Sequence, residues 1–370
     1  MKRRPKVILG LSGGVDSALA GARLLEAGYR VEGLFMKNWE DDDEPGYCAA
    51  EADLAVAREV ADTLGIPLHK ANYTTRYRER VFALFLAEYA AGRTPNPDIL
   101  CNPEIKFPAL VEHARRLGAD HVATGHYAEV RHAPDASALL RAADAGKDQT
   151  YFLCRLTQAQ LRPALFPLGS LLKSDVRRQA QALGLPNHAR RDSTGICFIG
   201  ERRFRDFLSR YLRATEGEIR TPEGQLLGTH RGLMFYTPGQ RQGLGIGGVA
   251  GGTESPWYVV DKDTANNRLI VAQGANHPVL QSRGLTTGTP HWIREPAVRG
   301  EPLMARIRHR QPLQAARIVH AVPSGLEVAF EQTQRAVAPG QSIVFYRGRE
   351  CLGGAVIAAR SREPLDPVPV

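Results

Sequence analysis

Short apolar runs alternate with helical patterns along the first 130 residues of the chain. The apolar runs read "KVILGLS", "YRVEGLFMK", "PLHKAN" and "DHVATGHY", and the helical patterns cover 15–28, 48–64, 76–91 and 104–118. Strands that are separated by helices can run parallel, with the helices packed on both faces of their sheet. The pattern therefore predicts an α/β domain with a Rossmann-like parallel sheet, which binds its ligands at the carboxyl ends of its strands.

The pattern changes twice further along the chain. Residues 157–213 favour basic helices, whereas turn residues become frequent after about residue 215, as in "TPEGQLLGTHRG" and "YTPGQRQGLGIGG". From residue 285 onward, "MARIRHR", "QAARIVHAV", "GLEVAFE", "QSIVFYRG" and "CLGGAVIAA" predict successive strands of a small antiparallel β-barrel. A chain of 370 residues can form several cores. We predict a catalytic domain over 1–205, a small β-rich central domain over 206–280 and a C-terminal β-barrel over 281–370.

The charge of the chain is concentrated in one span. The formal net charge is +9, and between Lys147 and Arg213 thirteen Lys or Arg stand against five Asp or Glu. This surplus favours a polyanionic partner, although solvated helix faces would explain it equally well.

Hydropathy and cysteine spacing exclude several classes of protein. No run of eighteen or more apolar residues occurs, and the first apolar run is too short for a signal peptide, so we expect a cytoplasmic protein that crosses no membrane. The five cysteines, at positions 48, 101, 154, 197 and 351, form no C-x-x-C pair. This spacing argues against structural disulfides and a zinc site, and we expect no metal held by a cluster of protein ligands.

The segment "LGLSGGVDSALA" at 9–20 is the most specific short motif. A strand is predicted to end at Ser12, Gly13 and Gly14 and a helix to begin near Val15, so backbone N–H groups and the positive end of a helix would face an anion. The glycines permit close approach of the backbone to phosphate, and Ser12 and Ser17 can supply hydroxyl donors. The Gly-Lys-Ser/Thr ending of a Walker loop is absent, and an ordinary glycine turn is the weaker alternative. The segment is predicted to hold a pyrophosphate group.

The pattern "SGGVDS" resembles the PP-loop of the N-type ATP pyrophosphatase superfamily. The resemblance implies that ATP is split between its α and β phosphates and that an oxygen of the substrate is adenylated. Asp16 would help to hold magnesium pyrophosphate, so ATP and Mg²⁺ are implied. The residues implied to bind the nucleotide are Gly10, Leu11, Ser12, Gly13, Gly14, Val15, Asp16, Ser17, Met36 and Gly125.

A second candidate site lies in "TPNPDILCNPEIKF" at 94–107. A residue that precedes proline is shifted toward extended conformations, so the two Asn-Pro pairs predict that Asp98 and Cys101 lie on a loop. A thiol there can be a nucleophile, a metal ligand, half of a disulfide or a small buried apolar group. Cys197 lies on another interrupted segment, where the preceding Arg190 and Arg191 would lower the pKa of its thiol.

Ordered motifs along nearly the whole chain resemble the tRNA-specific 2-thiouridylase family. They are "LGLSGGVDSA", "GLFMKNW", "RTPNPDILCNPEIKF", "ATGHYA", "GKDQTYFL", "DSTGICFIGERRF", "GLMFYTPGQRQGLGIGG" and "PGQSIVFYRG". Ala18 stands where many members have a second serine, a departure that we expect to be tolerated. Members convert the wobble uridine at tRNA position 34 to 2-thiouridine.

The resemblance implies a role for each candidate thiol. After adenylation of O2 of the uridine, Cys197 would carry the incoming sulfur as a persulfide, Cys101 would be the partner thiol, and Asp98 would act as acid or base. The cysteines at 48, 154 and 351 are expected to be structural.

The same resemblance implies tRNA contacts, including some in the barrel domain. They are Asn96, Pro97, Asp98, His126, Lys147, Asp148, Gln149, Arg308, His309 and Gln341. The implied partners are the tRNAs for Lys, Glu and Gln and a protein that donates sulfur, either a cysteine desulfurase or a relay carrier. We expect a monomer.

Two other functions stay open from the sequence. A PP-loop ligase for a small molecule would need ATP and Asp16 but neither Cys101 nor Cys197. An RNA-binding protein with a relic nucleotide fold is disfavoured because Asp16 and Ser17 are intact. The two thiols combined with the nucleotide loop favour a tRNA-modifying enzyme.

Overall fold

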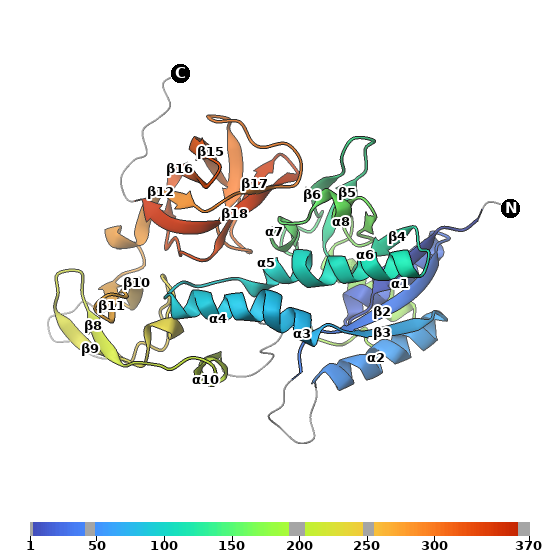
Figure 1. Cartoon of the computed structure of the whole chain (residues 1–370), viewed down its shortest axis with the longest axis horizontal. Helices are drawn as coiled ribbons and strands as arrows, with labels where there is room; N and C mark the ends of the chain where they lie inside the picture. Colours follow the sequence, from blue (N-terminus) through green and yellow to red (C-terminus); the bar gives the residue numbers. More distant parts are fainter. Residues whose placement is uncertain (1–2, 41–48, 192–203, 247–254, 362–370) are drawn as a thin grey trace.

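The computed structural model of the chain describes residues 3–40, 49–191, 204–246 and 255–361. Figure 1 shows three regions: a sheet covered by helices (blue to green), a small β-rich region (yellow) and a barrel (orange to red). Among the described residues, no helix combines the length and the apolar character that a membrane crossing requires.

The first region contains a five-stranded sheet in which all neighbours run parallel, in the order β3-β2-β1-β4-β7. Its strands are β1 (Lys6–Gly10), β2 (Arg30–Lys37), β3 (Leu68–Asn72), β4 (His121–Ala123) and β7 (Ala164–Leu165). Strand β1 lies at the centre, and Val7, Ile8 and Leu9 are fully buried. Burial on both faces explains the unbroken apolar run of this strand. The predicted Rossmann-like sheet is confirmed.

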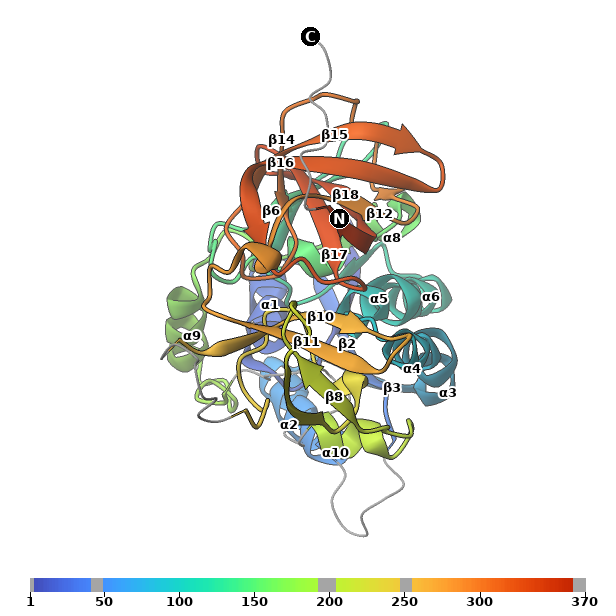
Figure 2. The same ribbon diagram turned by 90° about the vertical axis from the view of Figure 1, so that its left-hand side faces the viewer.

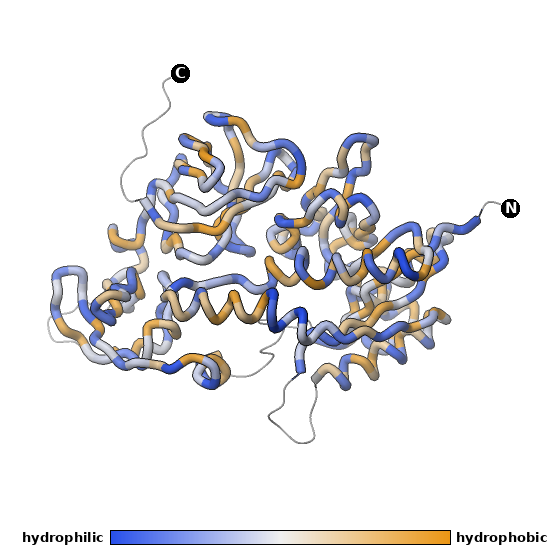
Figure 3. Tube along the Cα trace, viewed as in Figure 1, coloured by the Kyte–Doolittle hydropathy of each residue, from blue (hydrophilic) through white to orange (hydrophobic). Residues whose placement is uncertain are grey.

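Helices cover both faces of this sheet. The helices of the first region are α1 (Val15–Glu26), α2 (Ala49–Leu64), α3 (Thr74–Tyr77), the π-helix η1 (Arg78–Phe82), α4 (Ala83–Ala90), α5 (Pro97–Cys101), the π-helix η2 (Asn102–Lys106), α6 (Phe107–Arg116), α7 (Thr150–Leu153), α8 (Gln158–Leu161) and α9 (Lys173–Ala182). Of these, α1 and α2 pack on one face of the sheet and α6 on the other. Figure 3 shows hydrophobic and hydrophilic stretches alternating along the helices, as expected for helices with one buried face.

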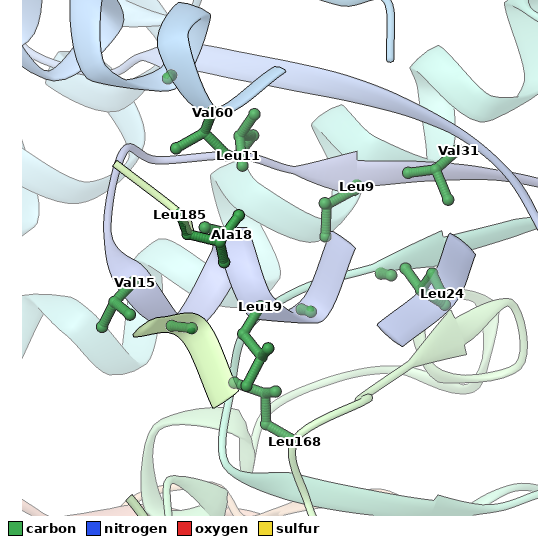
Figure 4. Packing of buried hydrophobic residues seen from close by; sticks show 14 of the residues in the cluster. Leu9, Leu11, Val15, Ala18, Leu19, Leu24, Val31, Val60, Leu168 and Leu185 are labelled. Atoms are coloured by element: carbon green, nitrogen blue, oxygen red, sulfur yellow. The ribbon is translucent and has the colours of Figure 1, made fainter. Parts of the chain in front are cut away.

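Successive residues of β1 enter two different cores because side chains alternate across a strand. Leu9 packs in one core with Leu19 of α1 and Val60 of α2, and Figure 4 shows this cluster. Ile8 packs on the other face with Phe107 and Leu110 of α6. The sheet is therefore fixed between two helical layers, and the ends of its strands are left for ligands.

The prediction of a loop over 94–107 is wrong, because Pro97 begins α5 and helical turns continue through η2 into α6. Pro97 occupies the first turn, where no backbone donor is needed, and Asn96 caps the helix by accepting from Asp98 N at 3.2 Å. Asn102 adopts helical angles (φ −65°, ψ −58°) although Pro103 follows it. The wider π-helical turn accommodates Pro103, whose ring would clash in a regular α-helix.

The second region is a four-stranded sheet in the order β10-β11-β8-β9. Its elements are α10 (Phe204–Ser209), β8 (Gly217–Arg220), β9 (Leu226–His230), the 3₁₀-helix η3 (Leu233–Phe235), β10 (Trp257–Asp263) and β11 (Arg268–Gln273). The expected β-rich central region is confirmed. The helical expectation for 157–213 is only partly met, because β7 lies within this span and residues 192–203 are outside the described part.

The third region is a closed barrel with the strand order β12-β16-β15-β14-β17-β18 and a final pairing of β18 with β12. Its elements are the 3₁₀-helix η4 (Pro278–Leu280), β12 (Gln281–Thr287), β13 (His291–Trp292), β14 (Leu303–Arg306), β15 (Gln314–Val322), β16 (Gly325–Arg335), β17 (Ser342–Arg347) and β18 (Glu350–Ser361). All of these pairings are antiparallel, which confirms the predicted barrel.

The barrel sheet also includes a hairpin from the first region. Strands β5 (Ala128–Arg131) and β6 (Ala138–Arg141) pair with each other, and β6 pairs with β18 through Leu139 and Cys351. Figures 1 and 2 both show this contact between the green hairpin and the red strands. The first and third regions therefore share one hydrogen-bonded sheet.

A buried ion pair ties the same two regions together. Arg306 of β14 donates to Asp148 Oδ2 at 2.8 Å, and the two side chains are 4% and 0% exposed. Asp148 also accepts from Thr150 Oγ1 at 2.9 Å and from Ala142 N at 3.1 Å. The carboxylate is thus satisfied only while both regions are in place.

Replacing Arg306 with Met should destabilise the protein by about 3 kcal/mol, because it removes the nearest partner of a buried charge. Arg141 Nε, 3.9 Å from Asp148 Oδ2, would be its remaining described cation. Arg178→Met is the matched control: Arg178 pairs with Asp175 at the surface, where ion pairs contribute little. Urea unfolding of both variants measures the difference, and equal stabilities would show that the buried pair is not needed.

Candidate active site

The nucleotide loop joins β1 to α1 and leaves the start of that helix open to an anion. Gly14 is the N-cap residue, and no side chain caps the helix there. The first backbone N–H groups of this twelve-residue helix therefore have no capping side chain from Gly14, and such a helix start favours an anion. Ser17 Oγ donates to the Gly14 carbonyl at 2.9 Å and accepts from Ser12 N at 3.2 Å. In this conformation the Ser17 hydroxyl stabilises the loop itself.

Gly13 is held by side chains that the sequence did not single out for this loop. Its φ of +78° favours glycine, and a Cβ at this position would lie 2.7 Å from the Asp53 carbonyl oxygen. Asn187 Nδ2 donates to the Gly13 carbonyl at 2.8 Å and Arg190 Nη1 at 3.2 Å, while Arg190 also pairs with the Asp53 carboxylate. The predicted effect of Arg190 on Cys197 involves a residue outside the described part of the chain; within that part, the Arg190 guanidinium positions the nucleotide loop.

Asp16 lies in the first turn of α1 and has two donors on one oxygen. Tyr127 Oη donates to Asp16 Oδ1 at 2.8 Å, and Lys173 Nζ donates to the same atom at 2.6 Å. Within the described part of the chain, no hydrogen bond reaches Oδ2. Lys173 comes from the start of α9, 157 residues away, so local sequence carried no signal for it. Tyr127 belongs to the "ATGHY" motif but was not selected.

The predicted strand-end residues meet around this loop. Met36 lies near the carboxyl end of β2, and its Cε is 3.7 Å from the position of a Cβ on Gly10. Gly125 follows β4, and a Cβ there would lie 2.7 Å from both Asp16 C and Ser17 N. The loops after β1 and β4 are thus in backbone contact, which requires glycine at 125.

The arrangement fits a nucleotide with magnesium. Backbone N–H groups at the start of α1 and the Lys173 ammonium match the oxygens of pyrophosphate, and Asp16 Oδ2 is the type of ligand that Mg²⁺ prefers. Gly13 and Gly125 permit the close backbone approach that the loop shows. The chemistry of the donor set is therefore consistent with Mg-ATP.

The second candidate site lies on α5, which begins at Pro97. Asp98 is half-buried in its first turn, whereas Cys101 at its last position is fully buried in a cluster with Phe82 and Phe85. In this conformation Cys101 has the surroundings of a small apolar group. Cys197 and Cys48 lie outside the described residues.

Residues 147–152 connect α5 to the nucleotide loop. Asn102, which is 2% exposed, donates from Nδ2 to the Asp98 carbonyl at 3.1 Å and to the Phe152 carbonyl at 3.0 Å. Gln149 N donates to the Tyr127 carbonyl at 2.8 Å, and Tyr127 N donates to Gln149 Oε1 at 2.9 Å. Because Tyr127 also holds Asp16, a continuous set of contacts joins the two candidate sites.

Barrel residues reach the same place. His309 packs on Phe152 with ring centroids 4.4 Å apart, and Gln341 Nε2 donates to the Thr94 carbonyl at 2.7 Å, shortly before α5. Arg308 Nη2 donates to the Arg335 carbonyl at 3.1 Å. The fold therefore brings His309 and Gln341 of the barrel next to 147–152 and the segment before α5, across more than 150 positions of sequence, whereas the hydrogen bond of Arg308 stays within the barrel.

Asp148 departs from this pattern. Its side chain is buried in the ion pair with Arg306, so it has no surface for tRNA in this conformation. The adjacent Lys147 and Gln149 are only half-buried, so they can still meet a ligand. The expected contact of the Asp148 side chain is corrected to a structural role between the first region and the barrel.

The two candidate histidines are neutral at physiological pH. Burial, aided by the charge of Lys106, lowers the pKa of His126 to about 3. Burial, together with Arg306 and Arg310, lowers the pKa of His309 to about 4. Both side chains can therefore stack on or hydrogen-bond to RNA, but they add no positive charge near pH 7.

Two of the remaining cysteines have no reactive character. Burial raises the pKa of the Cys154 thiol to about 12 and moves the pKa of the Cys351 thiol further above its usual range. A thiol that stays protonated is a poor nucleophile, so this part of the structure supports the expectation of packing roles.

Comparison with known families covers most of the chain. Residues 5–201 match the "tRNA methyl transferase HUP domain", 205–273 match the "tRNA methyl transferase PRC-barrel domain", and 282–357 match the "Aminomethyltransferase beta-barrel domain". The parallel sheet and its nucleotide loop thus place the first region in the HUP class of α/β domains.

Comparison with individual proteins defines the family. The tRNA-specific 2-thiouridylase MnmA of Alkalilimnicola ehrlichii is 58% identical over 363 residues, covering 98% of this chain and 99% of its own. The protein of the same name from Alcanivorax borkumensis is 56% identical, covering 95% and 97%. The chain belongs to the tRNA-specific 2-thiouridylase family.

Structural similarity to a solved neighbour is weaker. A 4-thiouridine synthetase in complex with RNA and ATP is 17% identical, with a TM-score of 0.34, and the match covers 56% of this chain and 50% of that one. This similarity is too low to bear on the site.

Proposed function

We propose that this chain is a tRNA sulfurtransferase that forms 2-thiouridine at wobble position 34 of tRNA, at the expense of ATP. The observation that carries the proposal is the continuous contact from Asp16 through Tyr127 and Gln149 to the segment that also holds Asn102 and α5. A nucleotide at the loop and a base at α5 would be neighbours. Family membership supports the same reaction.

The first step is adenylation of the base. O2 of the uridine attacks the α-phosphate of ATP, and pyrophosphate leaves. The start of α1 and Lys173 would stabilise the charge on the departing pyrophosphate, and Mg²⁺ held by Asp16 would neutralise it further. Asp98, half-buried on α5, is proposed to accept or donate the proton at the base edge.

The second step transfers sulfur. The terminal sulfur of a Cys197 persulfide attacks C2 and AMP leaves with O2, after which Cys101 attacks Cys197 and frees the thiolated base. Alternatively, Cys101 first releases the sulfur as sulfide. Both routes end in a Cys101–Cys197 disulfide, which an external dithiol must reduce by two electrons.

Partners and setting follow from the same proposal. The substrates are proposed to be the tRNAs for Lys, Glu and Gln, and the sulfur to come from a cysteine desulfurase or a relay carrier. The chain would work as a cytoplasmic monomer, with domains over 1–205, 206–280 and 281–370.

The proposal is tested with unmodified tRNA, Mg-ATP, a persulfide donor and the full chain. Mass analysis of the digested tRNA should find one sulfur at position 34, with an equal amount of AMP. AMP without thiolated base would contradict the proposal and favour a PP-loop ligase for a small molecule.

Affinity for tRNA should depend strongly on salt. The basic span 147–213 is proposed to contact phosphates, and each contact releases counterions. Raising the salt from about 50 to about 200 mM should weaken binding about 10-fold or more, the change expected from roughly two phosphate contacts. Filter binding over this range measures the slope, and a flat response would exclude the phosphate contacts.

A further inference from the structure

We propose that Tyr127 is a positioning residue that holds Asp16 at the nucleotide loop and couples the binding of ATP to the binding of tRNA. The inference rests on the proposed function, since it needs both ligands. This role differs from that of Asp16, which is predicted to bind the nucleotide, and from that of Gln149, which is predicted to contact tRNA.

The side chain of Tyr127 spans two elements that are far apart in sequence. The residue is 2% exposed, and its hydroxyl donates to Asp16 Oδ1 at 2.8 Å across 111 positions. Lys173 Nζ donates to the same oxygen and lies 5.7 Å from the centre of the tyrosine ring. A hydrogen bond from a hydroxyl to a carboxylate is among the stronger kinds, so the rotamer of Asp16 is fixed.

This geometry leaves one carboxylate oxygen for the ligand. Both described donors use Oδ1, and the Asp16 side chain keeps 32% of its surface exposed. The aromatic ring of Tyr127 is rigid, whereas the Lys173 ammonium is carried on a flexible four-carbon chain. Tyr127 therefore fixes the direction of Oδ2 better than Lys173 alone would. Tyr127 thus aims Oδ2 at the nucleotide.

The backbone of Tyr127 is hydrogen-bonded to Gln149, one of the predicted tRNA contacts. Its N–H donates to Gln149 Oε1 at 2.9 Å and its carbonyl accepts from Gln149 N at 2.8 Å. A reciprocal pair of this kind cannot shift at one end without moving the other. Displacement of Gln149 by tRNA would therefore move the phenol that holds Asp16.

The consequence is thermodynamic linkage. If tRNA at 147–149 improves the position of Asp16, it raises the affinity for Mg-ATP, and ATP must raise the affinity for tRNA by the same factor. We expect a factor of at least about 5 in the unaltered protein, the lower end of common coupling strengths.

The experiment measures nucleotide binding by equilibrium dialysis, with and without saturating unmodified tRNA. The Mg²⁺ complex of the α,β-methylene analogue of ATP is used for Mg-ATP, because adenylation of the tRNA would consume ATP itself. Tyr127→Phe should bind Mg-ATP roughly 5- to 10-fold more weakly, and the factor by which tRNA raises the affinity for Mg-ATP should fall toward 1. Gln149→Leu removes the acceptor of Tyr127 N, so it should also weaken Mg-ATP binding without tRNA and lose the effect of tRNA. Lys173→Met should weaken Mg-ATP binding by the same factor in both conditions. Tyr29→Phe, at the opposite end of the sheet, is the matched control.

Each outcome decides the inference. A Tyr127→Phe protein with the affinity and tRNA effect of the unaltered chain would overturn it, as would an unaltered chain whose Mg-ATP affinity ignores bound tRNA. If the unaltered chain binds no Mg-ATP or no tRNA at all, the proposed function fails first. Should Tyr127→Phe not fold, loss of the tRNA effect in a Gln149→Leu protein that filter binding shows to be saturated with tRNA supports the inference, and its retention overturns it.

Discussion

Replacing either Cys101 or Cys197 with Ser should abolish thiolation of tRNA while leaving tRNA binding nearly unchanged. A hydroxyl has nearly the size of a thiol, but it neither carries a persulfide nor closes a disulfide. Cys101 is fully buried, so its replacement changes little of the protein surface that would contact tRNA. The measurement is the amount of 2-thiouridine formed, with filter binding of tRNA alongside.

Cys351→Ala is the matched control for the thiol variants. Cys351 is buried where β18 meets the first region, and its sulfur lies 3.9 Å from the Thr150 carbonyl oxygen. Alanine removes one buried atom there, so its effect on packing should be small. This variant should keep its turnover. If Cys101→Ser or Cys197→Ser also kept the turnover of the unaltered chain, the two-thiol mechanism would be wrong.

The second large effect is expected at Gly125, where alanine should reduce AMP formation by about 100-fold or more. The added Cβ would lie 2.7 Å from Asp16 C and 2.9 Å from Asp16 O. Both distances are shorter than a normal van der Waals contact between a Cβ and a backbone atom. Because these are backbone atoms, the loops after β1 and β4 must separate. Displacement of reacting groups by about 1 Å commonly costs about 100-fold in rate.

The control for Gly125→Ala is Gly228→Ala in β9. A Cβ at Gly228 meets no atom within 4 Å, and its φ does not favour glycine, so AMP formation should be unchanged. Comparing AMP release and Mg-ATP binding in the two variants distinguishes the general effect of replacing glycine with alanine from the effect of the backbone clash at Gly125. Normal AMP release by Gly125→Ala would show that the two loops can separate without loss of function.

The sequence predicted the architecture well where local patterns decide it. Buried parallel strands such as β1 need apolar residues on both faces and read as an unbroken apolar run, whereas barrel strands such as β16 alternate from Leu326 to Phe330, so both leave a readable pattern. The glycines of the nucleotide loop were likewise readable, because a positive φ such as that of Gly13 restricts residue choice.

The predictions from sequence failed where contacts between distant elements, rather than local residue preferences, determine the structure. The Asn-Pro pairs of 94–107 suggested a loop, but Pro97 fits the first turn of a helix and a π-helical turn accommodates Pro103. The partners Lys173 of Asp16 and Arg306 of Asp148 lie more than 150 positions away, and nothing in their neighbourhoods marks them. Such pairs form only when separate elements pack together.

The shared sheet limits how this enzyme can be divided or recombined. An exchange of barrels between relatives that is cut between the first and third regions would pair a foreign β18 with the native β6, and would also separate Arg306 from Asp148. The hairpin over 128–141 belongs to the barrel sheet in hydrogen bonding although it precedes the barrel by more than a hundred positions. A working chimera would therefore have to transplant this hairpin segment with the barrel, as one discontinuous unit.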